Sequence, residues 1–219
     1  MDKNEGRRRA GQLAQQHRDN GDFLNWFEQL YAMAQHDPNA IPWADLEPNA
    51  QLVEWINEHG LRGDDKTAVV IGCGLGDDAE LLAEHGFSVT AFDISASAIE
   101  WCKRRFPKSH VNYIVADLFA LPADWVFDFV LEIYTIQALP LEFRDRAITA
   151  AASLVAPHGT LLAIGRLAGD VEERVKMPWP LTRVELDSFT RAGLRQAHFV
   201  DYLDGEENPV HRFRAEYRR

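Results

Sequence analysis

The 219-residue sequence has few cysteines, a deficit of basic side chains and no long apolar run. Its two cysteines, Cys73 and Cys102, form no Cys-x-x-Cys pair, which excludes a disulfide framework or a zinc knuckle and predicts two reduced thiols. The formal net charge of −11 repels phosphate backbones, so general nucleic-acid binding is not expected. The eight histidines show no metal-ligand spacing, and no metal is expected.

Apolar residues are nevertheless plentiful and well distributed. No stretch approaches the roughly 18 to 20 consecutive apolar residues that cross a bilayer, and the opening residues lead into no signal core. The hydrophobic fraction of 46% and the charged fraction of 26% are typical of a chain that folds around one core. We therefore expect one domain over residues 1–219, a cytoplasmic location and no membrane association.

The hydrophobic pattern alternates between strands and helices from residue 67 onward. Short apolar runs predict buried strands, and period-3.6 segments between them predict helices, as in a parallel sheet with right-handed crossovers. The expected strands are 68–71, 87–92, 111–115, 126–131 and 160–164, with helices at 78–84 and 96–105. Ahead of them, residues 1–62 read as helical, with amphipathic helices around 23–34 and 52–56 and a loop at 39–48.

Two Ser/Thr-x-x-Glu patterns predict helix starts, because the hydroxyl and the carboxylate of such a capping box satisfy free backbone donors. They begin at Ser97 and Thr182. Residues 166–181 predict a long loop. Two runs, 196–202 and 210–217, flank the turn-like segment 204–209 and predict an antiparallel hairpin.

A glycine-rich turn, Gly72-Cys-Gly-Leu-Gly76, follows the first expected strand. Glycines there allow a tight turn and close approach of a ligand. The dinucleotide fingerprint requires a glycine where this sequence has Asp77, followed by Asp78, at the helix start where a pyrophosphate would sit. Two carboxylates disfavour such a group. S-adenosylmethionine, which has no phosphate and carries cationic groups, has no such conflict.

Acidic residues also end the next two expected strands. Asp93 lies 17 residues beyond Gly76, where a carboxylate can accept hydrogen bonds from both ribose hydroxyls. Asp117 is placed to accept from an adenine amino group, with Leu118 or Phe119 beside the ring. Open α/β sheets bind ligands at the carboxyl ends of their strands, so these positions predict a cofactor site.

Taken together, Val69–Asp77, Phe92–Ser95, Ala116–Phe119, Phe127–Glu132 and Leu154–Thr160 resemble the class I S-adenosylmethionine-dependent methyltransferases over roughly residues 65–166. The flanks are similar to the thiopurine methyltransferase-like branch, which includes halide and thiol methyltransferases. Two departures are Val70, where an acidic residue is usual, and the lack of an Arg just after the fourth strand. The resemblance implies a Rossmann-like, doubly wound, mostly parallel seven-stranded α/β sheet with an antiparallel C-terminal hairpin and an N-terminal helical lid.

The sequence and the resemblance together predict segments and site residues. Residues 1–62 would form the cap, 65–166 the cofactor-binding core, and 167–219 the substrate-side loop and hairpin. Glu132 and Tyr134 are the candidate catalytic residues, with His36 and Asp45 as further candidate bases. The expected contacts of the cofactor S-adenosylmethionine are Trp26, Trp43, Gly72, Gly74, Gly76, Asp93, Ile94, Asp117, Leu118 and Glu132. Trp179 completes a possible aromatic lid, although core packing explains each tryptophan as well.

In-line methyl transfer mainly requires an aligned, dry site, and soft nucleophiles need no base. The sequence therefore favours a small-molecule acceptor with sulfur or another soft nucleophile. Transfer to an amine or hydroxyl is the main alternative. An NAD-linked oxidoreductase and a non-catalytic cofactor-binding scaffold are further alternatives.

Overall fold

The computed structural model describes residues 3–169, 174, 177–205 and 209–219. The strands form a seven-stranded sheet in the order β3-β2-β1-β4-β5-β7-β6. The chain divides into two compact units, one of Met1–Asp65 and Gly72–Asp117, the other of Lys66–Ile71 and Leu118–Arg219. Parts of the predicted long loop, 170–173 and 175–176, and of the predicted turn, 206–208, lie outside the described residues.

The first unit contains the N-terminal helices and two strands: α1 (Lys3–Asp19), α2 (Asn25–Ala34), η1 (Pro38–Ala40), α3 (Ala50–His59), α4 (Asp77–Glu84), β2 (Ser88–Asp93), α5 (Ala96–Arg105) and β3 (Asn112–Val115). The sequence pattern did not resolve α1, whose buried face is made mostly of the small residues Gly6, Ala10 and Ala14. A Cβ on Gly6 would lie 2.7 Å from the Asn39 carbonyl oxygen. Small residues are therefore needed where α1 meets η1. Because small residues contribute little to a hydrophobicity pattern, the buried face of α1 is hard to detect in the sequence.

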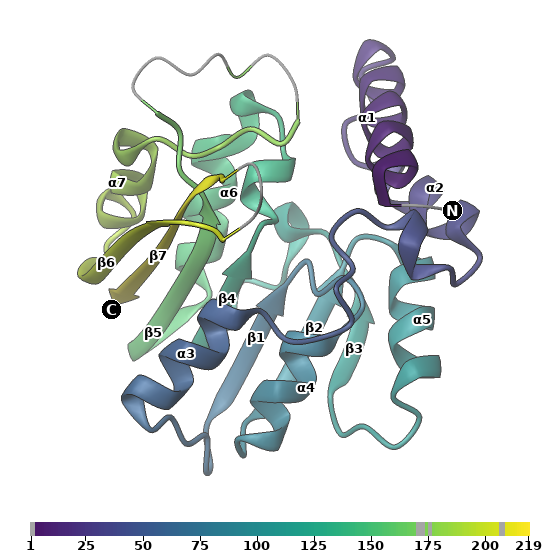
Figure 1. Ribbon diagram of the computed structural model, residues 1–219. Helices are drawn as coiled ribbons and strands as arrows, with labels where there is room; N and C mark the ends of the chain where they lie inside the picture. The colour runs from purple at the N-terminus through teal and green to yellow at the C-terminus, as the bar shows by residue number, and fades with distance from the viewer. Residues whose placement is uncertain (1–2, 170–173, 175–176, 206–208) are drawn as a thin grey trace. The chain divides into compact units, whose positions relative to one another are not determined.

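Strands β2 and β3 pair in parallel, with Phe92 opposite Ile114, and α5 runs alongside β3 (Figure 1). Helix α5 spans the predicted residues, but the predicted capping box at Ser97 is wrong. The N-cap is Ser95, whose side chain accepts from the Ala98 backbone N–H at 3.0 Å. Ser97 contacts Glu28 of α2 instead, a long-range partner that a local pattern cannot reveal.

The second unit contains β1 (Thr67–Ile71), η2 (Leu118–Ala120), β4 (Phe127–Ile133), η3 (Ile136–Ala138), η4 (Leu141–Phe143), α6 (Arg144–Ser153), β5 (Val155–Arg166), α7 (Arg183–Arg191), β6 (Arg195–Leu203) and β7 (His211–Arg218). β1, β4 and β5 are parallel, whereas β5, β7 and β6 are antiparallel neighbours (Figure 1). The predicted parallel strands and C-terminal hairpin are confirmed. The capping box of Thr182 and Glu185 is also confirmed.

Helix α6 was not predicted from the sequence. Its buried face consists largely of alanines, with Ala147, Ala151 and Ala152 beside Ile148. Such a face has little contrast with its surroundings in a hydrophobicity pattern. The helix nevertheless begins with a completely buried arginine, Arg144, which is 2% exposed.

Candidate functional site

The glycine turn of the first unit has the backbone that its composition predicted. Gly72, Gly74 and Gly76 have φ angles of 61°, 54° and 91°, in the left-handed region that favours glycine. A Cβ on Gly76 would lie 2.5 Å from the Tyr113 hydroxyl. The Cys73 N–H donates to the Phe92 carbonyl at 2.9 Å, which ties the turn to the end of β2.

Asp93 joins this turn to the beginning of α5. One carboxylate oxygen accepts from the Gly74 N–H at 3.0 Å, and the other accepts from the Ser95 N–H at 2.9 Å. The side chain is 7% exposed. Burial raises the pKa of Asp93 to about 6, although these backbone donors favour the charged form. The end of β3 also meets this residue, because the Ala116 N–H donates to the Asp93 carbonyl at 3.0 Å.

The sequence suggested two uncompensated carboxylates at the start of α4, but in the structure both have partners. Asp77 forms an ion pair with Arg105 of α5, with nitrogen–oxygen distances of 2.6 and 2.7 Å. Asp78 accepts from the Asn49 N–H at 2.7 Å, and burial raises its pKa to about 6. The argument from charge against a pyrophosphate is therefore weaker than the sequence suggested. Arg105 lies 28 residues from Asp77, so this compensation was not visible locally.

An aromatic cluster of the N-terminal segment lies against the glycine turn. The Trp43 indole N–H donates to the Tyr31 hydroxyl at 2.8 Å. A Cβ on Gly74 would lie 3.3 Å from that hydroxyl and 3.9 Å from the indole nitrogen. Trp26 is buried and meets Trp43 edge to face, with ring centroids 6.1 Å apart. Tyr31 was missed as a site residue because it belongs to the apolar stripe of α2.

The other predicted cofactor contacts are divided between the two units. Ile94 is half-buried and directly follows Asp93. Asp117 is half-buried at the end of the first unit. Leu118 is buried and opens the second unit.

Glu132, near the end of β4 in the second unit, is 2% exposed. Its Oε1 accepts from the Ile136 N–H at 2.9 Å, so the carboxylate caps the short helix η3. Burial raises the pKa of Glu132 to about 7, against the opposing effects of backbone donors and the positive charge of Arg144. This carboxylate can hold a proton near neutral pH.

Tyr134 follows β4 with a φ of 63°, which is unusual for a residue with a side chain. Its hydroxyl accepts from Arg212 Nη1 at 2.7 Å. Arg212 also donates to Asp204 at 2.6 Å, so the C-terminal hairpin fixes the phenol. Arg212 was not identified from the sequence, where the C-terminal arginines read as a solvated strand.

Comparisons with known proteins relate the chain to methyltransferases. Residues 68–159 match the methyltransferase domain family. This match covers less than half of the chain and relates residues 68–159 to methyltransferases. Cypemycin N-terminal methyltransferase of a Streptomyces species is 33% identical over 100 residues, which are 43% of this chain and 40% of that protein.

Two solved structures illustrate how widely the fold of this chain is shared. The N-methyltransferase NodS from Bradyrhizobium japonicum, bound to S-adenosyl-L-homocysteine, has a TM-score of 0.69 at 20% identity, covering 87% of this chain and 98% of that one. A structure described as the conversion of a disulfide bond into a thioacetal group during echinomycin biosynthesis also has a TM-score of 0.69, at 18% identity, covering 89% and 91%. At these identities the likeness establishes the fold alone.

The remaining candidate residues of the chain have local partners. His36 is exposed and meets the Trp101 ring at 5.2 Å between centroids, and Asp45 forms an exposed ion pair with Lys3. Trp179 is buried, and its backbone N–H donates to the Gln137 carbonyl at 2.8 Å. Cys73 and Cys102 are free, as expected, and the Cys102 thiol donates to the Gly74 carbonyl at 3.1 Å.

Within the described residues, no group of three or more His, Cys, Asp or Glu is arranged to hold a metal ion. None of the described helices is long and apolar enough to cross a membrane. The second unit also contains a hollow of about 480 Å³, with Leu118, Phe119, Trp125, Arg146 and Thr149 among its lining residues. Leu118 and Phe119, either of which was predicted to lie beside the adenine ring, both line it.

Proposed function

We propose that this chain transfers the methyl group of S-adenosylmethionine to a small molecule, most favourably to sulfur or another soft nucleophile. The observation that carries the proposal is the hydrogen bond between Asp93 and the Gly74 N–H. It joins a glycine-rich turn, at a residue without a Cβ atom, to a buried carboxylate at the end of a strand. This is the arrangement that a ribose and its attached chain require. When bound, the cofactor supplies an electrophilic methyl on a sulfonium.

In this proposal the first unit provides most of the cofactor contacts. Gly72, Gly74 and Gly76 permit close backbone approach, and Asp93 accepts from the ribose hydroxyls, with Ile94 beside it. Asp117 accepts from the adenine amino group. Trp43 would provide an aromatic wall for the cofactor, and the buried Trp26 supports Trp43 through their edge-to-face contact. The resemblance also assigns Leu118 and Glu132 to the cofactor, as predictions from sequence.

The preference for a soft nucleophile rests on the partners of the two candidate catalytic groups. Glu132 caps η3, and the Tyr134 hydroxyl accepts from Arg212. Neither is arranged as a carboxylate–histidine pair that would take a proton from an amine or alcohol. A thiolate or halide needs no such base. The flanking motifs, which resemble the thiopurine methyltransferase-like branch, support the same acceptor class.

An amine acceptor is the second candidate. The names of two similar proteins favour it, because one acts on an N-terminus and the other is an N-methyltransferase. Either Glu132, which can exchange a proton near neutral pH, or Tyr134 would then serve as the base. In that case both side chains would be catalytic residues.

Methyl transfer from isotopically labelled S-adenosylmethionine tests the proposal. The acceptors are thiols, iodide, thiopurines, amines and phenols, and melting temperatures with S-adenosylhomocysteine or NADH are measured in parallel. We expect stabilisation by S-adenosylhomocysteine and label on a thiol, thiopurine or iodide. Turnover of an amine alone would replace the sulfur acceptor by the second candidate. Stabilisation by NADH alone would favour the oxidoreductase, and cofactor binding without any transfer would favour the scaffold.

A further inference from the structure

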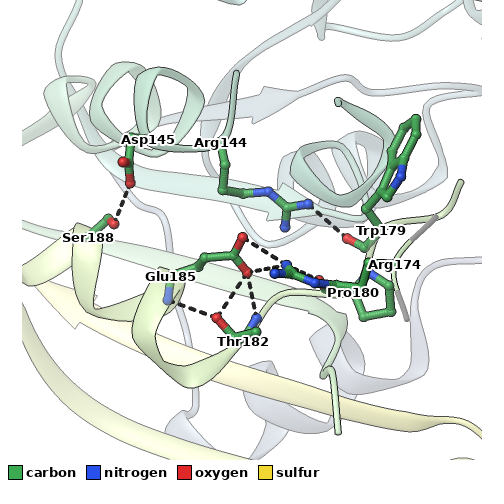
Figure 2. Close-up of polar contacts among 8 residues, drawn as sticks. All are labelled: Arg144, Asp145, Arg174, Trp179, Pro180, Thr182, Glu185 and Ser188. Carbon is green, nitrogen blue, oxygen red and sulfur yellow. Dashed lines mark hydrogen bonds and ion pairs between the residues drawn. The ribbon is translucent and has the colours of Figure 1, made fainter. Parts of the chain in front are cut away.

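Arg144, the first residue of α6, has a buried guanidinium with unused hydrogen-bond donors. Its side chain points toward the segment at Trp179 and Pro180, and Nη2 donates to the Trp179 carbonyl at 2.9 Å (Figure 2). Nε and Nη1 have no hydrogen-bond partner among the described residues, although only 2% of Arg144 is exposed. An arginine remains charged inside a protein, and buried charged donors are normally paired.

The two carboxylates whose charges act on Arg144 are both engaged elsewhere. Glu185 accepts from Arg174 Nη1 with both oxygens, at 2.8 and 2.7 Å, and one of those oxygens also accepts from the Thr182 N–H and hydroxyl (Figure 2). Burial alone would raise the pKa of Glu185, but these hydrogen bonds lower it. Glu132 accepts from the Ile136 N–H. Neither carboxylate therefore supplies a hydrogen bond to Arg144.

The charge balance of this cluster also leaves room for an anion. Arg174 and Glu185 compensate each other as a close ion pair. The remaining pair is Arg144 and Glu132, and burial raises the pKa of Glu132 to about 7. When Glu132 holds a proton, the four groups carry one positive charge in excess. A buried cation in excess is stabilised by an anion that also accepts its hydrogen bonds.

We propose that Arg144 binds a carboxylate of the methyl acceptor through its Nε and Nη1 donors. The inference rests on the proposed function, because it names the substrate class of the same methyltransferase. A monoanion fits better than a phosphate dianion, since the second guanidinium, Arg174, is already bound to Glu185. Nη2 keeps its bond to the Trp179 carbonyl, so the bound carboxylate and the segment 177–181 are held by the same side chain.

The burial of Arg144 sets a condition for binding. With 2% of the residue exposed, a carboxylate reaches the guanidinium only when the covering segment opens. Two hydrogen bonds hold Trp179 in this covering segment. Its carbonyl accepts from Arg144, and its backbone N–H donates to the Gln137 carbonyl. The closed segment then gains a further link through the ligand. Amide exchange at Met177, Trp179 and Leu181 should therefore slow when the carboxylate is bound.

The first test uses binding, so that it does not depend on turnover. We would saturate the protein with S-adenosylhomocysteine and follow the line width of ¹³C-labelled acetate by NMR, with acetamide as the uncharged probe. The variants are Arg144→Met, Arg144→Lys and the matched control Arg146→Met, which lies on the exposed face of α6. Acetate should bind to the wild type and to Arg146→Met, at least tenfold more weakly to Arg144→Lys, and undetectably to Arg144→Met. Acetamide should not bind.

The second test uses turnover of mercaptoacetate against 2-mercaptoethanol. The wild type should prefer the carboxylate by about 10- to 100-fold in kcat/KM, mainly through KM, the range expected for a hydrogen bond to a charged group. Arg144→Met should lose this preference while its affinity for S-adenosylhomocysteine stays unchanged. The carboxylate site is overturned if the wild type does not bind acetate. It is also overturned if Arg144→Met binds acetate as tightly as the wild type does. A wild type that fails to bind S-adenosylhomocysteine contradicts the proposed function instead, and acetate can then be tested on the protein alone.

Discussion

Glu28 of α2 accepts a hydrogen bond from the Ser95 hydroxyl at 2.7 Å, two residues beyond Asp93. The same carboxylate accepts from the Ser97 N–H at 3.0 Å and from its hydroxyl at 2.6 Å. Burial would raise the pKa of Glu28, but the hydrogen bonds from Ser97 and Ser95 lower it. The N-terminal segment is therefore fastened to the start of α5 by a half-buried carboxylate.

Glu28→Gln should loosen this fastening. The variant loses a charge-assisted set of hydrogen bonds, which costs about 1.5 to 3 kcal/mol of stability in typical cases. We expect faster amide exchange in residues 25–34, and slower exchange there when S-adenosylhomocysteine is added to the wild type, as a lid requires. Glu47→Gln, an exposed change in the same segment, is the control. If the amide exchange rates in residues 25–34 change neither in the variant nor on addition of the ligand, the segment is only part of the core.

Point substitution is a sharper test of the lid than removal of the N-terminal residues. Trp26, Leu30, Tyr31 and Ile41 are all buried, at 3% exposure or less. Their removal would uncover apolar surface as well as any lid. A loss of activity after truncation would therefore have two explanations.

Glu132→Gln should change the pH dependence of stability. The folded-state pKa of about 7 lies above the ordinary value of 4.5, so folding favours the protonated carboxyl. The wild type therefore loses stability as pH rises from about 4.5 through 7, by on the order of 3 kcal/mol, and glutamine does not.

Urea unfolding of both proteins at pH 5 and pH 8 measures this difference. The free energy of unfolding of Glu132→Gln, relative to that of the wild type, should be larger at pH 8 than at pH 5. Asp78 and Asp93 titrate in the same direction but are present in both proteins, so they cancel from the comparison. A constant difference between the two proteins at both pH values would mean that Glu132 is not held protonated by burial.

Thr182→Ala should lower the melting temperature by removing the N-cap of α7. The Thr182 hydroxyl accepts from the Glu185 N–H at 3.2 Å, and the Glu185 carboxylate accepts from the Thr182 N–H at 2.7 Å. Loss of such a cap costs about 1 kcal/mol, or roughly 2 to 4 °C for a chain of this size. Thr149→Ala, on the exposed face of α6, should cause no loss. Equal effects at the two positions would contradict the capping role.

The sequence predicted features that depend on near neighbours. The apolar run before Gly72, the acidic residue that ends β2 and the Thr182–Glu185 box each need only a few consecutive residues, and all lie where expected. A buried parallel strand has both faces apolar, which makes it visible in a one-dimensional pattern.

Features that depend on distant partners were not predictable in this way. Ser97 resembles an N-cap, yet Glu28 occupies its hydroxyl and Ser95 caps the helix. Asp77 reads as a free charge until Arg105 is placed beside it. Arg144 reads as one more surface arginine, because nothing near it in the chain indicates that α6 buries its first side chain.

A calorimetric titration with S-adenosylhomocysteine, applied to the wild type and to Asp93→Ala, tests the central claim most directly. Asp124→Ala, at an exposed acidic residue, is the control. The account predicts wild-type binding with an affinity in the micromolar range, and a loss of about 1.5 to 3 kcal/mol in Asp93→Ala, equal to about 10- to 100-fold, with no loss in the control. No binding to the folded wild type, or an affinity that Asp93→Ala leaves unchanged, would contradict the account.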